Sequence, residues 1–109
     1  MSGGTFDYVQ YRMDQTINDI EDIIFYNDDK TLNDWGDTKG RGYTEETIQE
    51  FKLGVWYLRQ ALTYTHEIDY LLSGDTGEES FHERLTRKLN IISNRLKKDL
   101  EKLVNHETD

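Results

Sequence analysis

The chain has 109 residues, no cysteine and no proline, and its formal net charge is -9. The lack of cysteine excludes disulfides, thiolate metal sites and thiol nucleophiles, and the excess of acids disfavours direct nucleic-acid binding, which needs clustered Lys and Arg. Neither an apolar run of about 18 residues nor a signal-peptide pattern is present, so the sequence predicts a cytoplasmic protein without a membrane span.

The first predicted helix covers residues 7–27. Its apolar residues recur at spacings of 4, 4, 3 and 4, which places them on one face of a helix. Asp7 suits the start of this helix, because an acid complements the positive end of the helix dipole. The apolar face consists of Val9, Met13, Ile17, Ile20 and Ile24.

An irregular loop is predicted for residues 28–43. The segment is rich in Asn, Asp and Gly, lacks a helical period, and is long for a connection within a compact domain. A loop of this length is either functional or partly disordered. We expect Leu32 and Trp35 to anchor it onto the helices.

Two longer helices are predicted over residues 45–72 and 77–105. Thr44 is a good N-cap for the first, and Thr76 with Glu79 forms a capping box for the second. The turn between them is short, so the two helices must be antiparallel neighbours. The sequence therefore predicts one all-α domain over residues 1–109, an antiparallel three-helix bundle with a long hairpin and an irregular loop.

A candidate ligand-binding end follows from this topology. If the first two helices are antiparallel, the amino terminus and the 73–77 turn lie at the same end. That end combines glycines that permit close approach, aromatic faces for a base to stack on, and an arginine fork for phosphate. The residues are Ser2, Gly3, Gly4, Phe6, Tyr8, Tyr11, Arg12, His66, Tyr70, Asp75 and His82. Two alternatives stay open: a capped turn with aromatic packing, or parallel helices, which would separate the two segments.

Metal binding and catalysis find little support in the sequence. His66 and His82 have acidic neighbours at helical spacing, but no HExxH motif occurs and no carboxylate set converges from three helices. Paired carboxylates like those of all-α nucleotide pyrophosphatases are not recognisable, and no catalytic triad or phosphate loop is present. The sequence predicts no metal, no cofactor and no catalytic residues.

Two further surfaces are candidates for contacts. The 28–43 loop has the composition of a lid or partner contact, through Trp35, Lys39, Arg41 and Tyr43. Its alternative is a plain surface connection. The second long helix also carries three aromatics beside its main apolar stripe, which indicate either self-association or packing against the first helix and the loop. These aromatics are Trp56, Tyr57 and Tyr64.

Two segments carry a resemblance. The opening of residues 1–8, Met-Ser-Gly-Gly-Thr-Phe-Asp-Tyr, and the turn of residues 73–82, Ser-Gly-Asp-Thr-Gly-Glu-Glu-Ser-Phe-His, resemble a group of short proteins found in phages, prophages and bacteria. The resemblance covers most of the chain and implies a bacterial or viral origin. It brings no activity and no functional residues with it.

The sequence thus leads to two functional hypotheses. One is a non-enzymatic, oligomeric helical binding protein that takes a small nucleotide-type signal, as a phage counter-defence protein would. The other is an acidic interaction module or inhibitor of a basic, nucleic-acid-binding host protein, because residues 1–43 hold nine acids against four bases and residues 44–76 hold six against two.

Overall fold

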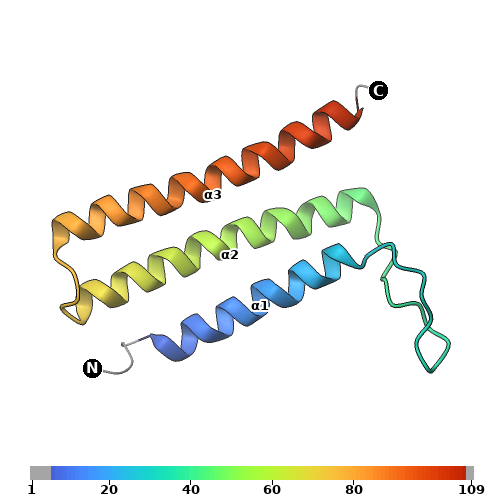
Figure 1. The fold of residues 1–109 in the computed structure, drawn as a ribbon, viewed down its shortest axis with the longest axis horizontal. Coiled ribbons are helices and arrows are strands. Elements are labelled where there is room, and N and C mark those ends of the chain that lie inside the picture. The colour runs from blue at the N-terminus through green and yellow to red at the C-terminus, as the bar shows by residue number, and fades with distance from the viewer. Residues whose placement is uncertain (1–5, 108–109) are drawn as a thin grey trace.

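The computed structural model describes residues 6–107, and the side chains of residues 6–98. It consists of three helices, α1 (Asp7–Phe25), α2 (Glu45–Leu72) and α3 (Glu78–Glu107). Each runs antiparallel to the next, and α2 and α3 form a long hairpin (Figure 1). The predicted all-α fold, its hairpin and its antiparallel order are therefore confirmed.

The three helices lie side by side in a flat layer. The chain extends 51 × 39 × 14 Å, so its thinnest dimension is close to the 10–12 Å diameter of a single helix. The central helix α2 packs against both neighbours, whereas α1 and α3 make no contact with each other within the described residues (Figure 1). The bundle is thus a flat one, without a central core enclosed by three helices.

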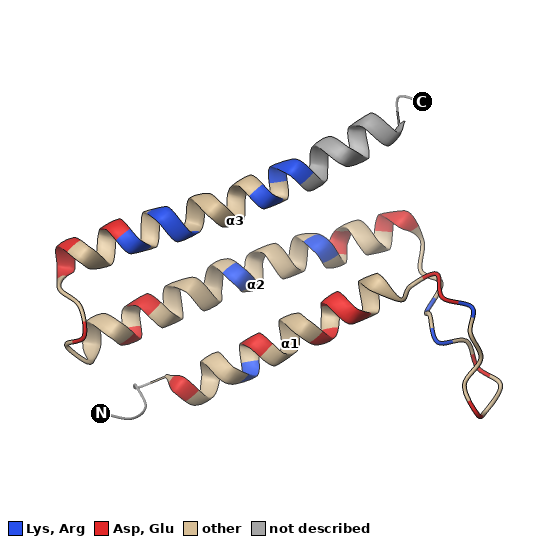
Figure 2. Cartoon of the chain, viewed as in Figure 1, with Lys and Arg blue, Asp and Glu red and all other residues tan. Residues whose placement is uncertain are grey.

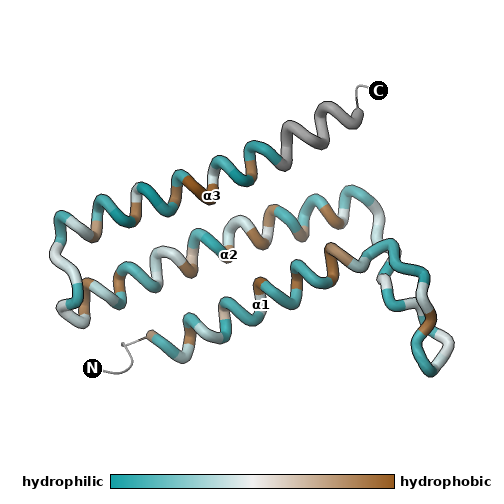
Figure 3. Tube along the Cα trace, in the orientation of Figure 1, coloured by the Kyte–Doolittle hydropathy of each residue, from teal (hydrophilic) through white to brown (hydrophobic). Residues whose placement is uncertain are grey.

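This flat arrangement leaves a very small apolar interior. Among the described residues, the buried apolar side chains are Ile17 of α1 and Ile48 and Val55 of α2. Other apolar positions recur along all three helices but remain partly exposed (Figure 3). Buried polar groups therefore contribute much of what holds the helices in place.

The helix ends differ slightly from the predicted ones. Helix α1 ends at Phe25, two residues before the predicted end, because Asn27 is buried and organises the following loop. Helix α3 begins at Glu78, one residue later than predicted, so the residue directly before it is Gly77 and not the predicted cap Thr76. Gly74 follows α2 with a φ of +78°, the left-handed conformation expected of a residue that ends a helix.

The 28–43 loop is held at its base by Asn27. The side chain of Asn27 accepts a hydrogen bond from the backbone N–H of Tyr43 (2.9 Å) and donates one to the carbonyl of Tyr43 (3.0 Å). The expected anchors were wrong: Leu32 and Trp35 are 63% and 86% exposed. The loop projects beyond the layer (Figure 1), and side chains this exposed are not packed on a helix.

Gly40 gives this loop base a sharp test. A Cβ atom at Gly40 would lie 2.3 Å from the carbonyl oxygen of Tyr26 and 2.4 Å from that of Asn27. We expect Gly40→Ala to lower the free energy of unfolding by about 1–3 kcal/mol, because the backbone must shift to admit the methyl group. Urea titration measures this. In the control Gly54→Ala, the new methyl group meets nothing within 4 Å, and a slight gain in stability is expected. Equal effects of the two substitutions would contradict the description of the loop base.

Candidate functional site

Those of the predicted ligand-binding residues that the structure describes share one end of the layer. Because α1 is antiparallel to α2, the start of α1 lies beside the 73–77 turn (Figure 1). Ser2, Gly3 and Gly4 lie outside the described residues. The antiparallel geometry on which the prediction rests is therefore present, and the remaining residues can be located individually.

Several polar groups at this end connect α1 to α2. Asp69 is buried, and its carboxylate accepts hydrogen bonds from the backbone N–H of Phe6 (3.3 Å) and from Nε2 of Gln10 (3.1 Å). Gln10 Oε1 lies 2.8 Å from Nδ1 of His66. The ring of His66 contacts that of Tyr70, with centroids 4.3 Å apart. Phe6, His66 and Tyr70 thus take part in helix packing at this end.

The other predicted residues at this end form separate small groups. Arg12 donates a hydrogen bond to the hydroxyl of Tyr8 (2.6 Å) and lies over its ring, and both side chains are exposed on α1. Tyr11 lines a shallow depression together with His66 and Lys88. The two remaining residues, Asp75 and His82, are exposed. The end therefore offers exposed aromatic and cationic groups, but not in a single enclosed pocket.

A buried carboxylate on α2 connects it to α3. Glu67 has no exposed surface, and its oxygens lie 2.8 Å from Nε of Arg84 and 2.6 Å from Nζ of Lys88. Burial alone would raise the pKa of Glu67, but the hydrogen bonds and charges of Arg84 and Lys88 outweigh burial and hold that pKa below its ordinary value. Arg84 also lies over the ring of Tyr70 (5.1 Å), so this cluster adjoins the predicted end.

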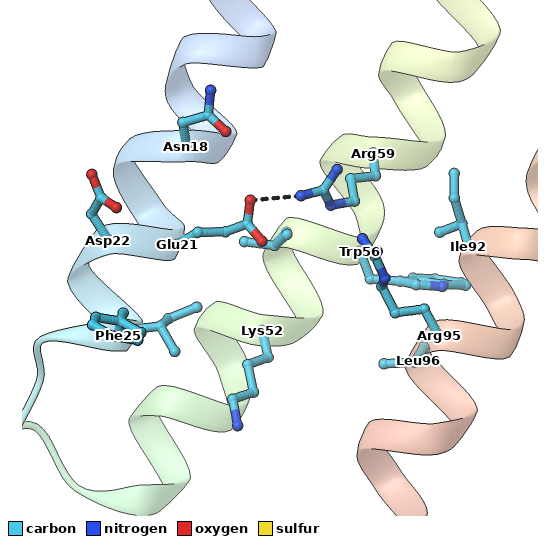
Figure 4. A pocket seen from close by; sticks show the side chains of 12 residues that line it. Asn18, Glu21, Asp22, Phe25, Lys52, Trp56, Arg59, Ile92, Arg95 and Leu96 are labelled. Atoms are coloured by element: carbon cyan, nitrogen blue, oxygen red, sulfur yellow. Dashed lines mark hydrogen bonds and ion pairs between the residues drawn. The ribbon is translucent and has the colours of Figure 1, made fainter.

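A larger hollow lies on one face of the layer, toward the end where the loop leaves (Figure 4). We call it the groove. All three helices line it, because α1 and α3 stand on either side of α2 without closing over it. Its volume of 590 Å³ falls within the range of small-molecule sites. Its lining residues are Asn18, Glu21, Asp22, Ile24, Phe25, Lys52, Val55, Trp56, Arg59, Ile92, Arg95 and Leu96.

The groove combines an aromatic surface with cations. Arg59 is paired with Glu21 at 2.6 Å, whereas neither Lys52 nor Arg95 forms an ion pair with any described side chain. The side chain of Trp56 reaches from α2 toward α3 and lies beside Arg95 (Figure 4), and its indole nitrogen is buried without a hydrogen-bond partner among the described residues. The groove can therefore offer two available cations and an indole to a ligand.

Charge is distributed unevenly over the layer. Helix α1 carries five acids and a single base, whereas residues 84–98 of α3 carry six bases and no acid (Figure 2). The cationic wall of the groove comes from this part of α3 and from α2. A chain with a net charge of -9 thus contains a local site that can attract an anion.

Sequence reasoning did not identify the groove. It assigned Trp56 to an outer aromatic set and gave no role to Lys52, Arg59 or Arg95 as a group. A signal was present in α2, where positions 52, 56, 59, 63 and 66 follow the spacing of one helix face. Recognising it required knowing that α1 and α3 leave this face open.

The loop residues predicted as a lid or partner contact lie at the opposite end of the layer from the amino terminus (Figure 1). Trp35 is 86% exposed, and Arg41 is also exposed. Lys39 Nζ lies over the ring of Tyr26 (4.0 Å). Tyr43 packs its ring edge-on against Phe51 (5.5 Å), so it helps to hold the loop base.

No family model, curated protein or solved structure matches this chain. Within the described residues, no helix has both the length and the apolar content needed to cross a bilayer. No cluster of three or more His, Asp or Glu side chains suited to a metal ion occurs in the same part of the chain.

The ion cluster of Glu67 predicts a pH-dependent contribution to stability. We expect Glu67→Gln to lower the free energy of unfolding by about 1–3 kcal/mol at pH 7, because it removes the ion pairs with Arg84 and Lys88. The loss is limited because these two cations are about one-third exposed and keep contact with water. Since the pKa of Glu67 is lowered by folding, its stabilising effect is present above about pH 4.5 and is lost as the pH falls below that value.

Urea titrations of both proteins between pH 7 and pH 3 measure this effect. The difference between wild type and Glu67→Gln should shrink with acid. As a control, Glu21→Gln removes a carboxylate that is 44% exposed, so it should change stability by less than about 1 kcal/mol. A Glu67→Gln difference that is constant with pH would contradict the ion-cluster account.

Proposed function

We propose that this protein is a non-enzymatic binding protein whose groove takes a small, nucleotide-type anion. The observation that carries the proposal is a groove of 590 Å³ that brings Trp56 together with Lys52 and Arg95, two cations that form no ion pair with a described side chain. This combination suits a ligand with one flat, apolar part and one negatively charged part. A long nucleic acid is disfavoured, because the net charge of -9 repels an extended polyanion.

The flat part of the ligand finds an apolar surface in the groove. Trp56 offers an indole for a base to stack on, and such stacking contributes about 1–3 kcal/mol. Phe25, 78% exposed at the α1 wall, adds a second aromatic ring. The indole nitrogen of Trp56 is buried and lacks a hydrogen-bond partner among the described residues, so the ligand meets the apolar part of the ring.

The anionic part of the ligand finds two cations. Arg95 presents a planar fork that matches phosphate geometry, and Lys52 presents a compact charge on the neighbouring helix. The groove acids Glu21 and Asp22 lie on the α1 side, and Glu21 is already paired with Arg59. We therefore place the phosphate beside Arg95 and Lys52, away from the acids of α1, and the base against Trp56.

The cellular role that fits such a binder is sequestration of a signal. The resemblance of residues 1–8 and 73–82 to short phage and bacterial proteins implies a bacterial or viral origin, and for a binder of that origin we propose a counter-defence role in the cytoplasm of a bacterial host. In this role, the protein lowers the free concentration of a nucleotide signal and need not transform it. The exposed Tyr8, Tyr11 and Arg12 at the amino-terminal end of the layer are a second place where the same ligand class could be held.

Titration with nucleotides tests the proposal. The chain contains two tryptophans, so Trp35→Phe leaves Trp56 as the reporter of the groove. In this variant, a panel of cyclic and linear nucleotides should include a ligand that changes Trp56 fluorescence and releases heat in calorimetry. No fluorescence change and no heat across the panel would refute a nucleotide ligand.

Substitutions distinguish the groove from the amino-terminal end. Lys52→Ala and Arg95→Ala should each weaken binding about 10- to 100-fold, because each removes a charge-assisted hydrogen bond to the anion. Lys97→Ala is the matched control, since it removes an exposed cation of α3 outside the groove and should leave affinity unchanged. Binding that is lost in Tyr11→Ala, but not in Arg95→Ala, would place the ligand at the amino-terminal end.

The alternative function is an interaction module for a basic host protein. The acids of α1 and of the loop, which are prominent in Figure 2, favour this interpretation. Such a complex would depend on charge and would weaken as salt screens it. Capture of a partner that persists at high salt would count against this alternative.

A further inference from the structure

A row of apolar side chains on α2 faces away from the groove. We call it the outer row. Its members follow one another at spacings of 4, 3, 4 and 4, so they share one face of the helix. The groove side of α2 is formed by positions 52, 56, 59, 63 and 66, about half a turn away. The outer row consists of Tyr57, Ala61, Tyr64, Ile68 and Leu72.

The outer row is uncovered although it lies at the centre of the layer. Tyr57 and Leu72 are 60% and 63% exposed, and Tyr64 is 44% exposed. None of its members is charged, although 32% of the residues of the chain are. The spacing also approximates the heptad pattern by which helices pack against one another. An uncharged, largely apolar helix face of this kind is normally buried against another helix.

The chain as a whole exposes much more surface than a compact monomer. Its accessible surface is 8359 Å², about 2,000 Å² more than the roughly 6,300 Å² expected for a folded monomer of 12.9 kDa. Its radius of gyration is 17.8 Å, against about 13 Å for a compact domain of this length. Stable protein interfaces bury about 800 Å² per partner, so the excess is sufficient for a complete interface.

We propose that a second copy of this chain covers the outer row, so that two layers stack with their α2 helices in contact and their grooves facing outward. With a net charge of -9 per chain, two copies approach most readily through surface that carries no charge, and the residues of the outer row, from position 57 to position 72, are uncharged. The small side chain of Ala61 allows the two helix backbones to come close.

An antiparallel two-fold arrangement centred near Tyr64 fits the sizes of these side chains. It places Ala61 of each copy opposite Ile68 of the partner, where a small residue meets a larger one, and Tyr57 opposite Leu72. Each copy then offers the same patch to the other, as a closed two-fold dimer requires.

Sedimentation of the full chain tests the proposed surface. At micromolar concentration, the wild-type protein should sediment with the mass of a dimer, twice 12.9 kDa. The Ala61→Arg protein should sediment as a monomer, and its helical content should be unchanged. Position 61 is exposed in the single chain, so the arginine does not disturb the fold. Gln15→Arg, an exposed position of α1, is the control and should remain dimeric.

A monomeric wild type would overturn the proposal, and so would an Ala61→Arg protein that stays dimeric. A monomer that binds lipid vesicles would assign the outer row to a membrane surface instead.

Cross-linking tests the antiparallel arrangement. The chain has no cysteine, so a single introduced cysteine reports one position. Tyr64→Cys should form a disulfide between two copies under mild oxidation, whereas Tyr57→Cys should not, because the two copies of residue 57 would lie roughly 20 Å apart along the helices. Equal cross-linking at both positions would overturn the antiparallel arrangement. Nucleotide titration of Ala61→Arg tests the dimer proposal separately from the proposed ligand site in the groove, since the monomer should keep its affinity for the nucleotide.

Discussion

Two buried carboxylates of α2 determine how the layer is held together. Asp69 accepts hydrogen bonds from the start of α1, and Glu67 pairs with Arg84 and Lys88 of α3. A buried carboxylate is costly unless it is paired or hydrogen-bonded, so each of these groups is stable only while its neighbouring helix stays in place. They lie two residues apart on α2, and a residue step of two turns the helix by about 200°. The two outer helices are therefore held on opposite sides of α2.

This geometry creates two different faces. With α1 and α3 apart, the groove between them keeps Trp56 and its flanking cations accessible, while the opposite face exposes the uncharged outer row. A closed bundle would have buried the groove side of α2 between α1 and α3. The proposed ligand site and the proposed dimer surface thus have the same physical origin, although they lie on opposite faces and can be tested separately.

The sequence predicted the elements well, because they depend on local patterns. Apolar spacing and the Thr44 cap gave α2 its correct bounds, and the short turn after Leu72 gave the hairpin. The flat arrangement was not predictable, because it depends on the contacts that Glu67 and Asp69 make. Glu67 binds side chains of α3, and Asp69 binds the start of α1. The loop anchors were wrong for a similar reason: size and apolarity favoured Leu32 and Trp35, whereas hydrogen bonds of Asn27 hold the base. The groove was missed since its residues lie on three helices far apart in sequence.

The separation of α1 from α3 is the claim on which the flat layer and its groove depend. Spin labels on Asn18→Cys and Arg95→Cys, which line opposite walls of the groove, measure it directly in the monomeric Ala61→Arg background. Neighbouring helix axes lie about 8–10 Å apart, so a flat layer predicts a distance of about 20 Å or more between the labels. A distance of about 10 Å would show that α1 and α3 close over the groove side of α2, and would contradict the flat layer and its groove.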